Sequence, residues 1–325
     1  MKTSRKSGAY RLLVTMAIVI MLIIVLAEVV WIIRNSNSDT KTDGTDLTAD
    51  QTDDHTGTDQ SDEQAAEADL AAEWNTKVKA AIKEYDTYNG ENATRIPVLT
   101  YHMVVTDEKK SSYKYSHTGA AELAVSKSTF EEQMKWLKDR GYRTINCMEL
   151  YLWHEGKIKL PKESVLITFD DGAIGVATNA LPILKKYKTK ATIFIVGSRT
   201  KGNKSGTISY NRVQKIKREY SNIEFQSHTY KLHKNVKHND KAYEKVLKDA
   251  RKQDEYFDFN FLAYPYGHNF EEMRNAYRDS GIIKMAFTYD KEGGTYATID
   301  QDIYQIERIK VNANESFSKF TSWFE

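Results

Sequence analysis

A long run of apolar residues covers positions 12–33, and Glu28 is the only charged residue inside it. The run has the length that a helix needs to cross a bilayer. Lysines and arginines precede it, and by the positive-inside rule they keep the N terminus in the cytoplasm. Because no small-residue cleavage signature follows, we expect an uncleaved transmembrane signal anchor rather than a signal peptide. This pattern predicts a cytoplasmic tail at 1–11 and an extracellular location for everything after residue 33.

The pattern becomes almost entirely polar after the apolar run. Residues 34–69 are rich in Asp, Thr and Ser and contain almost no large apolar side chains. Such a segment cannot bury enough surface to offset the entropy of ordering, so it is predicted to be a disordered acidic linker. Apolar residues then return at helical spacing and predict a stalk helix over residues 70–90, carried by Leu70, Trp74, Val78, Ile82 and Tyr85.

Short β-like runs alternate with helical runs through the rest of the chain, a predicted folded domain at 91–325. Residues 164–169, with the sequence SVLITF, form the clearest strand, and residues 126–141 form the first helix. In that helix Ser128 and Glu131 have the spacing of a capping box. Repeated strand–helix units of this length predict an α/β fold with a mainly parallel sheet, and enough of them predict a barrel. Functional side chains of such barrels collect at the carboxyl ends of the strands.

Charge and cysteine content narrow the class of protein. The formal net charge is +2 although the linker is strongly acidic, so the folded domain must be basic. A basic domain suits anionic cell-wall polymers, and solubility alone would also explain it. The single cysteine, Cys147, excludes an internal disulfide, which fits a Gram-positive surface protein better than a secreted eukaryotic one. Beyond this common basic charge, nothing in the sequence indicates a nucleic-acid partner.

Polar side chains gather where the predicted strands end. Asp170 and Asp171 follow SVLITF directly, and paired carboxylates at the end of a buried strand are costly unless something neutralises them. An ordinary Asp-Gly turn would also explain the pair. Two other strands end in histidine, at His102 and His228, and a third ends in an aromatic-proline turn at 264–266. Because polar residues follow four strands, a single functional site at these strand ends is favoured over four unrelated turns.

Two imidazoles and one carboxylate form a common ligand set for a catalytic divalent metal. His228 and His233 stand five positions apart, so neither a helix nor a regular strand puts both on one face. The chain must therefore bend at Tyr230–Lys231 for both to reach one ion, and two unrelated loop histidines are the alternative. With one aspartate on the metal, the other can take a proton from water. His102 has the chemistry to protonate a leaving nitrogen, and the YPYG turn can offer a backbone N–H to an oxyanion.

The segments TFDDG, SHTYKLH and YPYG resemble the first three motifs of the polysaccharide deacetylases, carbohydrate esterase family 4, which share the NodB-homology domain. The similarity in motif order covers about residues 96–312. The resemblance implies a distorted (β/α)7 barrel and the hydrolysis of N-acetylated hexosamine glycans to free amine and acetate. It also implies a divalent metal cofactor, usually Zn²⁺, with other divalent ions tolerated.

Motif position within the family implies a role for each polar residue. Asp170 would be the general base, and the backbone N–H of Tyr266 would donate to the oxyanion. The metal ligands would be Asp171, His228 and His233. The five-residue histidine spacing and the segment YHMV are similar to the poly-N-acetylglucosamine deacetylase branch. In that branch the strand carrying YH supplies the catalytic acid, which is His102 here.

The sequence leaves two points open: which arginine pairs with the general base, and which residues contact the sugar. The third motif of the family usually holds an arginine that orients the base, and no arginine stands near YPYG. Arg308 could supply this role from a neighbouring strand, or it could be an ordinary salt-bridge residue. Aromatic residues should line a sugar groove, although core packing is the commoner role for any one of them. The candidates for sugar contact are Tyr230, Tyr264 and Pro265.

These features together predict a membrane-anchored extracellular N-deacetylase of a cell-wall or surface polysaccharide. Its substrate could be poly-N-acetylglucosamine, peptidoglycan, or the amino sugar that links a wall polysaccharide to peptidoglycan. The alternative from another class is a non-catalytic glycan-binding protein on the same barrel, although such a protein would be expected to lose the base or a ligand. A hydrolase of small cyclic amides would have little use for a membrane tether. The sequence does not reveal the oligomeric state or the role of the insertion after His102.

Overall fold

The computed structural model describes residues 60–109, 121–234, 236, 238–239, 241–289 and 296–325, with backbone only for 60–70. The predicted cytoplasmic tail, the signal anchor and residues 34–59 of the acidic linker lie outside these ranges, as does most of the insertion after His102. Residues 60–69 of the linker are helical, so the disorder predicted for them is wrong. Within the described ranges, no helix combines the length and the apolar character needed to cross a bilayer. Residues 61–325 form a unit separate from residues 1–60, and only this unit is described below.

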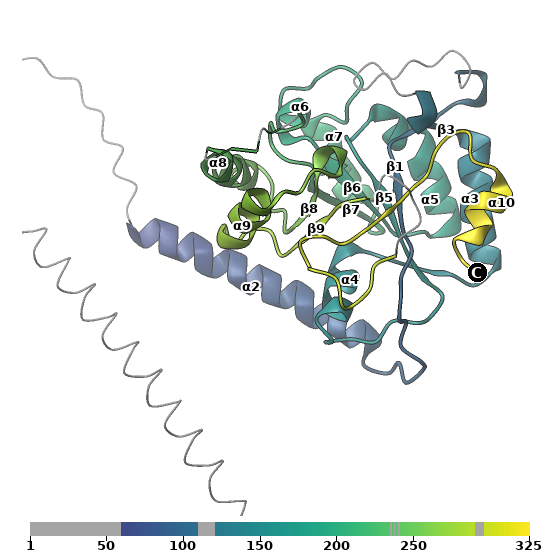
Figure 1. Ribbon diagram of the computed structural model, residues 1–325, viewed down its shortest axis with the longest axis horizontal. Coiled ribbons are helices and arrows are strands. Elements are labelled where there is room, and N and C mark those ends of the chain that lie inside the picture. Colours follow the sequence, from purple (N-terminus) through teal and green to yellow (C-terminus); the bar gives the residue numbers. More distant parts are fainter. Residues whose placement is uncertain (1–59, 110–120, 235, 237, 240, 290–295) are drawn as a thin grey trace, which may run out of the picture. The chain divides into compact units, whose positions relative to one another are not determined.

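The centre of the fold is a parallel β-sheet, as the alternation of strands and helices predicts. Its continuous path runs β10-β1-β5-β6-β7-β8-β9, and β4 pairs with the first half of β5. Figure 1 shows these strands surrounded by helices. The strands are β1 (Val98–Tyr101), β4 (Arg143–Ile145), β5 (Ser164–Phe169), β6 (Ala191–Ile195), β7 (Ile223–Ser227), β8 (Phe261–Ala263), β9 (Met285–Phe287) and β10 (Ile309–Lys310).

The segment before β10 curls the sheet toward closure. Thr288 N donates to Ile306 O at 2.8 Å, so this segment pairs with the chain at the end of β9. Three residues later, Ile309 of β10 pairs with Leu99 of β1. The two edges of the sheet are therefore joined through one segment, which produces a curled α/β half-barrel, consistent with the distorted (β/α)7 barrel that the family resemblance implies.

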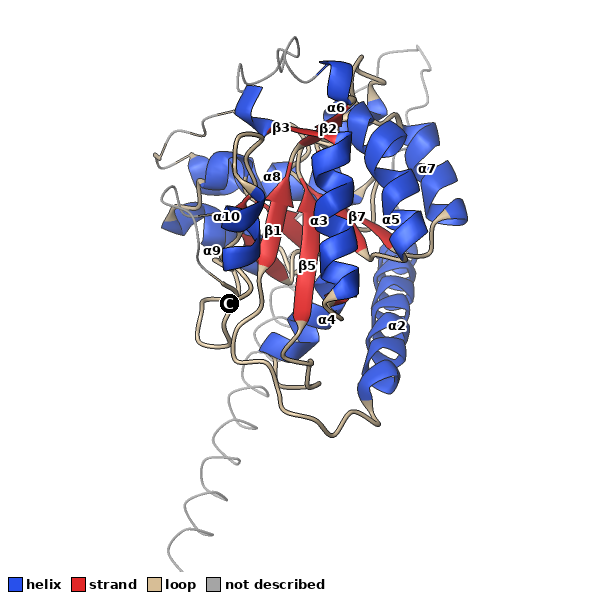
Figure 2. Cartoon of the chain, turned by 90° about the vertical axis from the view of Figure 1, so that its right-hand side faces the viewer, coloured by secondary structure: helices blue, strands red, loops and turns tan. Residues whose placement is uncertain are grey.

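Helices follow the strands and cover the outside of the sheet, with α3, α5 and α7 along one flank in Figure 2. A small parallel pair, β2 (Met103–Val105) and β3 (Ala124–Ser126), lies beyond the end of β1. Short turns of helix occur at 107–109, 121–123, 176–180 and 265–267. The helices are α3 (Lys127–Asp139), α4 (Cys147–His154), α5 (Leu181–Tyr187), α6 (Gly197–Lys201), α7 (Tyr210–Glu219), α8 (Ala242–Asp254), α9 (Glu271–Asp279) and α10 (Phe317–Ser322).

The predicted capping box at the start of α3 is wrong. The N-cap is Ser126, whose Oγ accepts a hydrogen bond from Thr129 N at 3.2 Å. Ser128 lies one residue inside the helix, where its hydroxyl instead donates to Asp107. The extended backbone of Ser126 at the end of β3 places its side chain over the first turn, which is the geometry a cap requires.

Alternate residues of the strands face opposite sides of the sheet and pack in separate cores. In β5, Val165, Ile167 and Phe169 face the layer of helices that contains Phe130 of α3. Leu166 faces the other side and packs in the barrel interior with residues from β1, β6, β8 and β9. A full set of buried side chains therefore occupies the barrel, and ligands can approach only at its ends.

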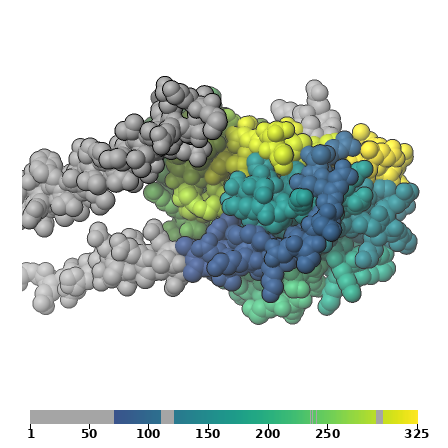
Figure 3. Space-filling view, turned by 90° about the horizontal axis from the view of Figure 1, so that it is seen from below, coloured from purple at the N-terminus to yellow at the C-terminus, as the bar shows by residue number. Residues whose placement is uncertain are grey.

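A long helix, α2 (Gln60–Tyr85), is attached to the amino-terminal end of the barrel. It begins ten residues before the predicted start of the stalk helix at residue 70, and it ends five residues before the predicted end at residue 90. Trp74 lies against the rings of Tyr151 and Phe261, with ring centroids 5.6 and 6.1 Å apart. Phe261 is the first residue of β8, so this contact lies at the start of that strand. Figure 3 views the molecule from this end, with the part of α2 from residue 71 onward in blue.

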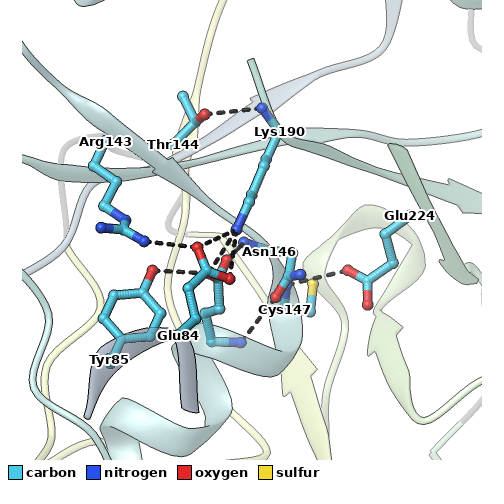
Figure 4. Close-up of polar contacts among 9 residues, drawn as sticks. Glu84, Tyr85, Arg143, Thr144, Asn146, Cys147, Lys190 and Glu224 are labelled. Carbon is cyan, nitrogen blue, oxygen red and sulfur yellow. Dashed lines mark hydrogen bonds and ion pairs between the residues drawn. The ribbon is translucent and has the colours of Figure 1, made fainter. Parts of the chain in front are cut away.

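A polar network fixes the end of α2 to the same end of the barrel (Figure 4). The Tyr85 hydroxyl donates to the buried carboxylate of Glu149 at 2.7 Å. Lys190 lies 2.7 Å from Glu149 and 3.2 Å from Glu84, and Glu84 also pairs with Arg143 at 2.6 Å. Because Arg143 begins β4 and Lys190 immediately precedes β6, the network joins α2 to the starts of two strands.

Candidate active site

The polar residues singled out by the sequence lie at the carboxyl ends of four strands. His102 follows β1, the two aspartates follow β5, His228 follows β7, and residues 264–266 follow β8. Because all four strands are parallel, these ends lie at the same end of the barrel. This end is opposite to the one that carries α2.

Asp171, His228 and His233 form a group whose possible ligand atoms all lie within 4.8 Å of one another. His233 Nε2 is 2.6 Å from Asp171 Oδ1, and His228 Nε2 is 3.9 Å from the same oxygen. His228 Nδ1 lies 2.8 Å from the carbonyl oxygen of Ala263, to which an Nδ1–H donates. The Nε2 lone pair of His228 is then directed to the group, as in metal-binding histidines. This donor set fits a divalent metal ion.

Burial and neighbouring charges set the protonation of this group. Burial would raise the pKa of Asp171, but its hydrogen bond to His233 and the nearby imidazoles hold the pKa below the ordinary range. Burial lowers the pKa of His228 to about 4. At neutral pH the group therefore presents a carboxylate and a neutral imidazole, which are the forms that coordinate a metal.

Asp170 is paired with Arg308 in the barrel. Arg308 Nη1 and Nη2 each lie 2.8 Å from one carboxylate oxygen of Asp170, and Arg308 is 0% exposed. Its Nε donates to the Thr288 carbonyl at 3.1 Å, which fixes the plane of the guanidinium. Burial would raise the pKa of Asp170, but Arg308 outweighs this and lowers it. The sequence left open whether Arg308 would reach the paired aspartates, and in the structure it does so from the segment that closes the sheet.

His102 is buried beside the two aspartates. Burial lowers its pKa, and the charges of Asp170 and Asp171 oppose this shift. Its Nδ1 has no hydrogen-bond partner among the described residues. A buried imidazole with an unpaired nitrogen near two carboxylates is suited to exchange a proton with a bound molecule.

The predicted sugar contacts through Tyr264 and Pro265 are wrong, because both side chains are buried. The Tyr264 ring packs against Tyr277 at 5.9 Å, within the core between β8 and α9. Tyr230 is partly exposed and stacks on Tyr256. Tyr266 has a left-handed backbone, with φ of 60°, and its side chain is 37% exposed.

The exposed ring of Tyr266 lies 4.9 Å from the ring of His233, and its hydroxyl is 3.3 Å from His233 Nδ1. From the sequence, only the backbone N–H of Tyr266 was given a role, and the side chain was not predicted to contribute. The accessible aromatic surface at the metal group therefore belongs to the third residue of the turn rather than to the first two.

Arg199 and Asp249 also belong to the site and were overlooked. Arg199, from α6, lies 3.3 Å from Asp171 Oδ1 and 3.0 Å from His233 Nδ1. Asp249, from α8, accepts hydrogen bonds from the backbone of Tyr230 and Lys231. No motif marks Arg199. Asp249 carries a signal, because it stands on the buried face of α8 between Val246 and Gln253, where a carboxylate is unexpected.

A curled parallel sheet with an Asp–His–His group at the carboxyl ends of its strands defines a class of α/β hydrolases that use a divalent metal. Comparison of the sequence and the fold with known proteins identifies the family within this class. The model of the polysaccharide deacetylase family matches residues 157–284. A poly-β-1,6-N-acetyl-D-glucosamine N-deacetylase of Staphylococcus aureus is 31% identical over 230 residues, which cover 66% of this chain and 78% of the relative. The chain belongs to the polysaccharide deacetylase family, whose members are amide hydrolases.

Solved structures agree with the fold. The deacetylase PplD of Streptococcus pyogenes, solved in complex with acetate, matches with a TM-score of 0.62 at 23% identity, over 72% of this chain and 99% of that chain. IcaB from Ammonifex degensii matches with a TM-score of 0.58 at 22% identity, over 72% and 98%. At these identities the similarity shows a shared fold, and the motif-based resemblance to the family is confirmed by the closer relative above.

The shifted pKa of His228 predicts that this residue lowers the stability of the metal-free protein in mild acid. A histidine in an unfolded chain has a pKa near 6.5, so between about pH 4 and 6.5 this residue binds more protons in the unfolded state than in the folded state. Buried His102 acts in the same direction, whereas the raised pKa values of Asp249 and Glu224 act in the opposite direction. The effect of His228 is therefore measured as a difference between the wild type and a variant. Urea unfolding at pH 5 and pH 7 measures the effect.

A His228→Asn variant should show a smaller difference between the two pH values than the wild type. His238→Asn is the matched control, because His238 is exposed on the surface, where it pairs with Glu272 and contacts the ring of Phe270. An equal pH dependence in the wild type and the His228 variant would contradict the prediction.

Proposed function

We propose that this protein is a divalent-metal-dependent N-deacetylase that removes acetyl groups from N-acetylglucosamine residues of a cell-wall or surface polysaccharide. The observation that carries the proposal is the Asp171–His228–His233 group beside the Asp170–Arg308 pair. The first offers three ligands, and the second offers an ionised carboxylate that is not needed as a ligand. A non-catalytic glycan-binding protein would have no use for both.

The three ligands would hold the metal, which we infer to be Zn²⁺ from two imidazoles and one carboxylate. A divalent ion in this position polarises an amide carbonyl and lowers the pKa of water. Asp170 would take the proton of the attacking water, and Arg308 keeps that carboxylate ionised and oriented. The backbone N–H of Tyr266 would donate to the developing oxyanion. His102 would give a proton to the nitrogen as the C–N bond breaks, so that acetate and a free amine leave.

The location and substrate follow from the predicted tether and from the relatives. A signal anchor at 12–33 would place the catalytic domain outside the membrane of a Gram-positive bacterium, within the reach of a flexible linker. This reach favours a glycan near the membrane or wall. The S. aureus relative is named for poly-β-1,6-N-acetyl-D-glucosamine. The proposed substrates are this polymer, peptidoglycan, and the amino sugar that links wall polysaccharide to peptidoglycan.

The test is acetate release by the purified full chain in mild detergent. The protein would be stripped with a chelator, reloaded with Zn²⁺ or Co²⁺, and mixed with N-acetylglucosamine oligomers or purified cell wall. The expected result is acetate release from at least one material by the reloaded protein and none by the stripped protein. Metal binding without acetate release from either material would favour the glycan-binding alternative, and a pull-down on the same materials would then show retention.

A further inference from the structure

We propose that Asp249 is a positioning residue for the metal group, because its carboxylate fixes the bend that brings His228 and His233 to one ion. This inference rests on the proposed function of the three ligands. Asp249 does not touch either imidazole. It acts on the backbone between them from α8, the helix that connects β7 to β8.

The bend is needed because the two histidines are five positions apart. His228 ends β7, and the backbone then turns sharply, with Thr229 at a φ of 68°. A left-handed conformation is unfavourable for a threonine, whose branched side chain crowds the backbone. The loop would relax to another conformation unless its polar groups were held in this one.

Each backbone N–H between the two histidines has an acceptor. Thr229 N donates to Ser227 Oγ at 3.1 Å, and Leu232 N donates to Thr229 Oγ1 at 3.1 Å, so these two bonds are internal to the segment. The other two N–H groups, of Tyr230 and Lys231, donate to Asp249 at 2.7 and 2.8 Å. They are the two residues at which the spacing of the histidines requires a bend. Asp249 therefore supplies the contacts to the turn that the loop cannot supply itself.

The opposite side of the loop is held by the start of α6. Gly197 N donates to Thr229 O at 3.1 Å, and Ser198 N donates to Tyr230 O at 2.8 Å. The loop is thus clamped between backbone donors on one side and the Asp249 carboxylate on the other. At Gly197 an added Cβ would lie 2.1 Å from Gln253 Oε1 and 2.7 Å from the Tyr230 ring, so a side chain there would require these two side chains to move.

Asp249 is itself rigidly placed. It is buried on α8, next to Val246 and Ala250, which pack in the core shared with α9. Burial raises its pKa to about 6, while the bonds from Tyr230 and Lys231 favour the charged form. At neutral pH the carboxylate is mostly ionised, and hydrogen bonds to an ionised acceptor are stronger than those to a neutral one.

The experiment measures metal affinity and metal geometry in Asp249→Asn and Asp249→Ala of the full chain. Asparagine keeps one acceptor oxygen and places an amide donor against the second N–H, so one of the two bonds is lost. Co²⁺ titration gives the visible absorption spectrum of the site, and competition with a chelator gives the Zn²⁺ affinity. Asp254→Asn is the matched control, because Asp254 lies on the same helix and accepts no hydrogen bond from residues 228–233.

The expected result is a Zn²⁺ dissociation constant raised about 10–100-fold in both Asp249 variants, with an altered Co²⁺ spectrum. The Asp254 variant should match the wild type. A purely structural role would lower the melting temperature without changing the spectrum or affinity of the folded protein. Wild-type affinity and spectrum in both Asp249 variants would overturn the inference.

A second measurement tests the role of Asp249 if neither Asp249 variant folds. Amide hydrogen exchange of the wild type should show slow exchange at Tyr230 and Lys231 both with and without Zn²⁺. Fast exchange at these two amides would overturn the inference. If the wild type bound no metal, the proposed function would be refuted. If the wild type and the Asp249 variants bound metal equally well, only the role of Asp249 would be refuted.

Discussion

Replacing Asp171 with alanine is expected to abolish metal binding, whereas replacing the adjacent Asp170 with asparagine should leave the metal in place and abolish turnover. Asp171 is the carboxylate shared by both histidines, and its removal leaves two imidazoles. We expect the Zn²⁺ affinity of this variant to fall more than about 100-fold. This is a larger loss than that caused by mutating a residue that only forms a hydrogen bond to a metal ligand. In Asp170→Asn, kcat for acetate release should fall about 10²–10⁴-fold, the usual contribution of a general base.

Metal analysis and acetate release on the same preparations separate the two aspartates. Asp279→Asn provides a control, because Asp279 lies on the surface, where its carboxylate accepts a hydrogen bond from the Tyr243 hydroxyl. If Asp171→Ala retained stoichiometric zinc, the ligand assignment would fail. If Asp170→Asn turned over at the wild-type rate, the base would have to be another residue.

Arg308→Met is expected to lower both stability and activity strongly. The substitution removes a buried cation and leaves the Asp170 carboxylate in the barrel without its bidentate partner. Breaking a buried ion pair from one side costs about 3–5 kcal/mol. Without Arg308, burial would raise the pKa of Asp170, so the remaining acetate release should shift to higher pH. Urea unfolding and a pH–rate profile measure the two effects.

Arg278→Met is the matched control for Arg308. Arg278 is also an arginine paired with an aspartate, Asp302, but the pair lies on the surface and is expected to contribute about 0–1 kcal/mol. Arg308→Lys adds a test of geometry, because lysine keeps the charge but cannot form two parallel bonds. A lysine variant with wild-type activity would show that charge alone suffices.

The sequence predicted the parallel sheet and the end of it that carries the site. The strand ends were marked by abrupt changes from β-forming residues to charged residues, such as the change from Ile167, Thr168 and Phe169 to Asp170. The closing segment before β10 was not predicted, because its hydrogen bonds to β9 come from an irregular stretch without strand periodicity. For the same reason the sequence could not decide whether Arg308 pairs with Asp170. That pair depends on how the two edges of the sheet meet.

The aromatic turn illustrates another limit. The sequence predicted sugar contacts for Tyr264 and Pro265 and used only the backbone N–H of Tyr266, because it does not show which of the three side chains faces outward. The backbone decides this, because the positive φ of Tyr266 turns the chain away from the core that holds Tyr264. Arg199 was invisible for a similar reason, since its contact with Asp171 depends on the direction of α6.

The attachment of α2 has a mechanical consequence. A pull on the chain at Gln60 would be transmitted along α2 to the ring contacts of Trp74 and to the ion pairs of Glu84. These contacts lie at the amino ends of the strands, whereas the metal group lies at the carboxyl ends. Tension would therefore peel the helix from the barrel before it loaded the strands that hold the ligands. The catalytic end would keep its geometry while the attachment yielded.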